Sequence, residues 1–169
     1  MARYSLGSSS CTTTSGGVAS GTTLTSSGYP FFLQGGSATQ QLKINEIQAG
    51  GEATAASAVQ ILRLGRDSVV GVTAITGCFN AAMDATVTAP GTLPTYGNAA
   101  TTNPTRSTTV GMLLAHSFNA YGGLVRWQAR QGEEITVISA TQPLGEVSYS
   151  PFTGNVAGPV STHCIYEIV

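Results

Sequence analysis

Short runs in which apolar and polar residues alternate recur along the chain between residues 42 and 169. The clearest run covers residues 124–130, where Val125, Trp127 and Ala129 are separated by arginine and glutamine. Successive side chains of a strand point to opposite faces of a sheet, so this run predicts a strand with one apolar face. We expect Trp127 to be largely buried between two sheets, with the arginines on the opposite face.

A tight turn is expected directly after this strand. Gly132 supplies the backbone freedom that a short turn needs, and the run at 133–139 then reads as the partner strand of a hairpin. Similar alternating runs predict strands at residues 42–47, 58–64, 68–75, 82–87, 110–116, 144–149 and 160–168. No helical period interrupts them, and glycine-containing turns separate them, so the chain is expected to be an all-β, jelly-roll-like antiparallel sandwich.

The first 40 residues differ from the rest of the chain. They are rich in serine, threonine and glycine, and they predict an extended arm in front of a sandwich domain at 41–169. The arm contains one apolar cluster with Tyr29, Phe31 and Phe32. These rings either dock on a neighbouring molecule, which we favour, or belong to a disordered tail. Removal of residues 1–35 is expected to leave the sandwich folded.

The composition excludes several classes of function. Charged residues make up only 9% of the chain, against about 25% in average soluble domains. A surface with so little charge suits a subunit packed into an assembly. The net charge of −1 and the scattered arginines argue against a nucleic-acid binder. No apolar run is long enough to span a bilayer, and no signal segment is recognisable, so we expect folding in the cytoplasm of the cell that makes the protein.

The chain carries few groups for chemistry. Its three cysteines, Cys11, Cys78 and Cys164, are far apart and are expected to be free thiols. His163 and Cys164 are neighbours on a predicted strand and should face opposite sides, so they do not form a metal site, even with His116 nearby. No phosphate loop, nucleophile elbow or zinc motif is present.

The carboxylates sit mostly in predicted turns and are expected to be solvated: Asp67, Asp84, Glu133, Glu134 and Glu146. We therefore expect no enzyme activity, no catalytic residue, no metal and no cofactor.

The C-terminal part of the chain resembles capsid decoration, or cement, proteins, which are small virion structural proteins of tailed bacteriophages. The segments that carry the resemblance are Leu42–Ile47, Arg126-Trp127, Gly132-Glu133, Leu144–Ser150 and His163–Glu167. The resemblance spans residues 41–169, and the long arm before residue 41 departs from it. It implies a non-enzymatic sandwich on the outer capsid surface that binds the major capsid protein and forms a homo-oligomer, a trimer first and a dimer next.

The expected mechanism is multivalent clamping of capsid subunits. The candidate partner contacts are Tyr29, Phe31 and Phe32 on the arm, and Arg126 and Arg130 on the polar face of a strand. The alternatives are a glycan- or receptor-binding sandwich, in which a long loop at 89–108 would carry specificity, and a tail or baseplate component.

Overall fold

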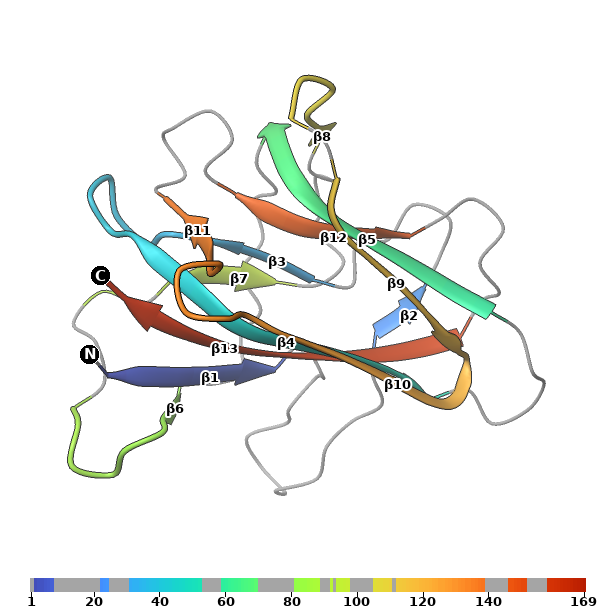
Figure 1. Ribbon diagram of the computed structural model, residues 1–169, viewed down its shortest axis with the longest axis horizontal. Coiled ribbons are helices and arrows are strands. Elements are labelled where there is room, and N and C mark those ends of the chain that lie inside the picture. Colours follow the sequence, from blue (N-terminus) through green and yellow to red (C-terminus); the bar gives the residue numbers. More distant parts are fainter. Residues whose placement is uncertain are drawn as a thin grey trace.

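The computed structural model describes the chain in separate ranges, which are residues 2–7, 22–24, 31–52, 59–69, 81–88, 92, 94–97, 105–110, 112–138, 146–151 and 158–169. These residues contain no helix, and so none that could cross a membrane. Their strands form two antiparallel sheets that pack face to face (Figure 1). The predicted all-β sandwich is confirmed.

The first sheet, called sheet 1, has seven strands. Its order is β10 (Tyr121–Gln128), β4 (Leu42–Glu52), β13 (Gly158–Ile168), β1 (Arg3–Gly7) and β6 (Ala81–Ala82), with β11 (Ile135–Val137) also beside β4 and β2 (Thr22–Leu24) also beside β13. The second sheet, called sheet 2, has six strands. Its order is β7 (Thr95–Gly97), β3 (Phe31–Gln34), β12 (Val147–Pro151), β5 (Val59–Val69) and β8 (Thr105–Arg106), with β9 (Met112–Asn119) also beside β5.

The strands pair in a nested order. β1 pairs with β13, β3 with β12, β4 with β10 and β5 with β9, and every pair is antiparallel. β1 therefore pairs with the last strand, β13. Each following pair lies, in sequence, between the two strands of the previous pair. This nesting across two sheets is the jelly-roll arrangement.

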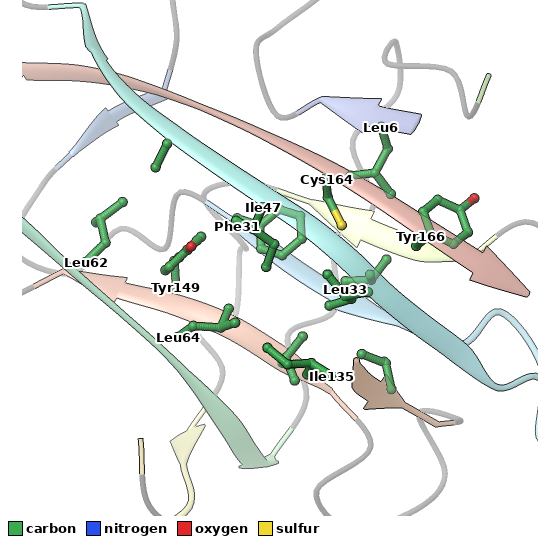
Figure 2. Close-up of a cluster of buried hydrophobic side chains, with 14 of the residues drawn as sticks. Leu6, Phe31, Leu33, Ile47, Leu62, Leu64, Ile135, Tyr149, Cys164 and Tyr166 are labelled. Carbon is green, nitrogen blue, oxygen red and sulfur yellow. The ribbon is translucent and has the colours of Figure 1, made fainter. Parts of the chain in front are cut away.

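The core lies between the sheets and takes side chains from both (Figure 2). On sheet 1, Leu6, Ile47 and Tyr166 are at most 1% exposed, and on sheet 2 the same holds for Leu64 and Tyr149. On β4 and β13 the buried residues alternate with more exposed ones, as expected for strands that bury one face. The burial of these apolar side chains stabilises the packing of the two sheets against each other.

The prediction that residues 1–40 form an arm outside the sandwich is wrong at the positions that the structure describes. β1 lies inside sheet 1 and β3 lies inside sheet 2, each between two other strands. Tyr4 and Leu6 enter the core from β1, and Phe31 and Leu33 enter it from β3. Serine and threonine around these strands lowered the apolar average, so a short alternation such as Tyr4-Ser5-Leu6 was not recognised as a strand.

Two other local predictions are wrong. The expected hairpin around Gly132 does not form, because β10 and β11 both pair with β4 and follow one another along its edge. Gly132 does have the positive φ of 87° that the predicted turn required. The strands expected at 58–64 and 68–75 are also not separated by a turn, since β5 continues through Gly65 with a register shift against β9. The predicted loop at 89–108 contains two short strands, β7 and β8.

Trp127 is only partly buried, although its predicted face is correct. Val125 and Trp127 pack against the core, and Arg126 and Gln128 are exposed on the other side of β10. β10 is at the edge of sheet 1, where the indole cannot be enclosed on all sides. Trp127→Ala should therefore cost less than the roughly 3–5 kcal/mol that is typical of an enclosed Trp. Denaturant unfolding of the variant measures this loss, and a loss at or above that range would contradict the partial burial.

Candidate partner-binding surface

The face of sheet 1 that points away from the core is the largest continuous face whose side chains are described. We call it the outer face of sheet 1. It is formed by alternate residues of four neighbouring strands, β1, β13, β4 and β10 (Figure 1). Its described polar residues are Arg3, Ser5, Lys43, Asn45, Glu46, Gln48, Glu52, Arg126, Gln128, Ser161, His163 and Glu167.

An ion pair stands in the middle of this face. Arg126 Nε donates to Glu46 Oε1 at 2.8 Å, and Arg126 Nη2 donates to Glu46 Oε2 at 2.6 Å. Gln48 Nε2 donates to the same Oε1 at 2.5 Å. This two-pronged bond leaves Glu46 only 5% exposed, and the Arg126 guanidinium lowers the pKa of its carboxyl. The fork of Arg126 is therefore occupied within the chain, which makes it a poor clamp for a partner's carboxylate.

His163 belongs to the same face. It is paired with Gln48 across β13 and β4. Burial lowers the pKa of His163, and the nearby charge of Glu46 opposes this effect. His163 is thus neutral at neutral pH, and the centre of the face carries one balanced ion pair. A partner that binds here meets a surface with little net charge.

Two exposed apolar side chains border one end of this face. Tyr121 and Leu124, both on β10, are 63% and 69% exposed. Beside Leu124, the missing side chain of Gly50 leaves a shallow hollow of about 250 Å³ that reaches Ser161 and His163. Exposed aromatic and aliphatic side chains next to a hollow are a common feature of protein-binding surfaces.

Some of the partner contacts predicted from the sequence are buried in the structure, and others are exposed or lie outside the described residues. Phe31 and Phe32 are 1% and 0% exposed, so the prediction that they anchor a partner is wrong for the folded chain. Phe31 is in the core, and Phe32 is buried on the opposite side of β3. Tyr29 lies outside the described residues. Arg130 is exposed next to the turn that follows β10 and stays a candidate contact.

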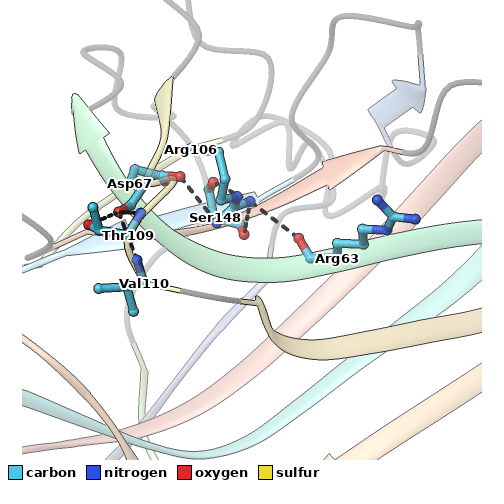
Figure 3. A network of polar contacts seen from close by, with 7 residues as sticks. Arg63, Asp67, Arg106, Thr109, Val110 and Ser148 are labelled. Atoms are coloured by element: carbon cyan, nitrogen blue, oxygen red, sulfur yellow. Dashed lines mark hydrogen bonds and ion pairs between the residues drawn. The ribbon is translucent and has the colours of Figure 1, made fainter.

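A buried polar network lies on the outside of sheet 2 and was missed by sequence reasoning (Figure 3). Asp67, Glu146 and Ser148 are all 0% exposed. The expectation that the carboxylates of Asp67 and Glu146 are solvated is therefore wrong. Arg106 Nη1 lies 3.1 Å from Asp67 Oδ1, and its Nη2 donates to the Ser148 carbonyl at 2.9 Å. The guanidinium lies over Gly65, where a Cβ would come within 2.6 Å of Nη1.

The network includes a second buried acidic residue. Glu146 is a second buried carboxyl group beside Asp67, and the backbone N–H of Asp67 donates to the backbone carbonyl of Glu146 at 3.2 Å. Burial raises the pKa of Asp67, and Ser148, Arg106 and Glu146 act against this rise. The only sequence signal was the β5 register, which places Asp67 on the same side of its strand as Gly65.

The remaining candidates for chemistry separate from one another. Cys164 is a free thiol in the core, and His163 faces outward from the same strand, as predicted. Burial raises the pKa of the Cys164 thiol, which makes it unreactive. His116 Nδ1 lies 2.9 Å from the hydroxyl of Tyr149, so it is turned into the sandwich. No three metal-ligating side chains meet among the described residues.

Comparisons with known proteins found no match among protein-family models, curated proteins or solved structures.

Proposed function

We propose that this chain is a non-enzymatic structural protein of a bacteriophage particle, a capsid decoration protein that binds and stabilises the shell. One observation carries the proposal. Most segments that resemble such proteins are far apart in sequence, yet β4, β10 and β13 are adjacent in sheet 1. Residues 42–47, 126–127 and 163–167 therefore lie on adjacent strands, and Glu46, Arg126 and His163 share the outer face of sheet 1.

The chemistry of this surface suits a structural partner. Its ion pairs, Arg126–Glu46 and Arg3–Glu167, are satisfied within the chain. Tyr121 and Leu124 then offer apolar contact area at the edge strand β10. We propose that they contact the major capsid protein, together with Arg130. A single contact of this size is weak, and a homo-oligomer, trimeric or else dimeric, would strengthen it through avidity.

Binding to capsid shells tests this proposal. Shells assembled without the protein should bind it in many copies on their outer surface, visible by electron microscopy with the chain labelled. The double variant Tyr121→Ser, Leu124→Ser should bind at least about tenfold more weakly, because it removes the apolar contact area. Met83→Ser is the matched control, since Met83 is 59% exposed and follows β6, at the other edge of sheet 1.

Location decides between this function and its alternative within the particle. Label confined to the tail would assign the chain to a tail or baseplate. Equal binding of shells by the double variant and the wild type would move the contact away from β10.

A further inference from the structure

The strand β4 contains an irregularity at Asn45 that both of its neighbours share. On one side, Glu46 is paired with Ile165 and Ile44 with Tyr166, so β13 passes over Asn45. On the other side, β10 ends opposite Glu46 and β11 begins opposite Ile44. A bulge of this kind redirects one side chain, and bulges are frequent next to binding sites.

The redirected side chain of Asn45 has an unused donor. Its backbone carbonyl accepts from the N–H of Ala129 at 2.8 Å, but its Nδ2 is buried and has no hydrogen-bond partner. Buried amide groups are normally paired, because an unpaired one costs free energy. A buried, unpaired donor that is held in place by a bulge is consistent with a ligand acceptor at this position.

Asn45 opens into a hollow of about 380 Å³ on the outer face of sheet 1. This volume is at the lower end of the range of about 300–1,000 Å³ for small-molecule sites. The side chains that line it are polar: Arg3, Asn45, Gln128, Gln131, Glu134 and Glu167. They come from all four strands of the face and from the turn after β10. The strands and the turn together form the walls of the hollow.

The charges of the hollow exclude two kinds of ligand. Arg3 Nε is bound to Glu167 Oε1 at 2.8 Å. Glu134 accepts from the backbone N–H of Gly132 at 3.0 Å, and this bond lowers the pKa of its carboxyl. Glu134 is therefore ionised at neutral pH, and the nearby charge of Lys43 also lowers its pKa. Arg3 and Lys43 balance the charges of Glu134 and Glu167, so the hollow has no excess positive charge for an anion. An anionic ligand would gain no net attraction here, and a hard cation lacks the six or so oxygen ligands that it prefers.

A neutral hydroxyl group fits what is left. Each hydroxyl donates one hydrogen bond and accepts others. The amides of Asn45, Gln128 and Gln131 can donate to it, and the carboxylates of Glu134 and Glu167 can accept from it. A ring with several adjacent hydroxyls would use both sets at once.

We propose that this hollow is a saccharide-binding subsite, in which the Asn45 amide turns about its Cβ–Cγ bond so that the buried Nδ2 donates to a sugar hydroxyl, and Glu134 accepts from another. The site lies at the opposite end of the face from Tyr121 and Leu124. It is separate from the proposed apolar capsid contact at Tyr121 and Leu124, although Arg130 is the neighbour of Gln131 in the turn beside the hollow.

The test is a titration of the isolated, full-length chain with neutral trisaccharides, namely chitotriose, maltotriose and galactotriose, followed by ¹H–¹⁵N NMR. At least one of them should shift the side-chain NH₂ signal of Asn45 and the backbone signals of Gln131 and Gly132. Asn45→Ala should weaken the binding of that trisaccharide about tenfold, which is the effect of about one well-made hydrogen bond. Gln131→Ala, on the exposed turn, should also weaken binding and does not depend on the bulge.

The matched control is Gln41→Ala, because Gln41 is an exposed amide outside the hollow. It should bind like the wild type. The proposal is overturned if no trisaccharide shifts these signals at millimolar concentration, if inorganic phosphate or calcium shifts them instead, or if both Asn45→Ala and Gln131→Ala bind as the wild type does. None of these outcomes depends on capsid binding, so they leave the structural function to its own test.

Discussion

Deletion of residues 1–34 is expected to abolish cooperative unfolding. The deletion removes β1 and β3, two inner strands of the jelly roll, and with them the buried Tyr4, Leu6, Phe31 and Leu33. It also leaves β13 and β12 without partners on one side. Since domains are stable by only about 5–15 kcal/mol, the remaining chain should not keep its fold. Circular dichroism with thermal unfolding checks this.

Two point variants on β1 make the same test in a milder form. Leu6→Ala removes a side chain that is 1% exposed, and it should cost about 2–5 kcal/mol. Ser5→Ala changes the neighbouring residue, which points outward, and should cost less than about 0.5 kcal/mol. A truncated chain that still unfolds cooperatively at a similar temperature would restore the interpretation of residues 1–34 as an arm.

Arg106→Ala is expected to be the most damaging change on the outside of sheet 2. The arginine is the described cation next to the buried Asp67, and it also donates to the carbonyls of Arg63 and Ser148. Removal of one partner of a buried ion pair typically costs about 3–5 kcal/mol. Denaturant unfolding at pH 7 should show a loss of this order. Arg130→Ala, an exposed arginine, is the control and should unfold like the wild type.

The loss of stability in Arg106→Ala should depend on pH, and the direction of this dependence follows from the pKa of Asp67. Burial raises that pKa above its ordinary value of 3.8, so the folded chain holds the proton more tightly than the unfolded chain. The contribution of Asp67 to stability is therefore largest below pH 3.8 and falls as the pH rises toward the folded pKa. Without Arg106 the pKa should rise further, and Arg106→Ala should be less destabilised at pH 4 than at pH 7.

Asp67→Asn separates this effect from other titrating groups. The amide keeps the shape of the side chain and cannot ionise, so the decline of stability with pH should become shallower. A variant with the same pH profile as the wild type would show that Asp67 is not the titrating group.

The candidate surface was predictable only in part. The alternation around Trp127 correctly placed Arg126 and Gln128 outside and Val125 inside. It could not show that Arg126 is bound to Glu46, because these residues are 80 positions apart. The same holds for the hollow at Asn45, whose walls come from four strands and one turn. Such contacts depend on which strands are neighbours in the sheet. The alternation of apolar and polar residues along one strand carries no information about its neighbours.

The sequence alone determined the class of fold and the faces of the main strands. Alternation sets which side chains can share a face, and that is a local property of a strand. Tertiary structure decided the rest. It joined β1 and β3 to the sheets, because pairing with β13 and β12 buries their few apolar residues. It placed β10 and β11 along β4 instead of against each other, and it buried Asp67 beside Arg106. In each case the outcome depends on a partner that is distant in the chain, and local composition does not specify it.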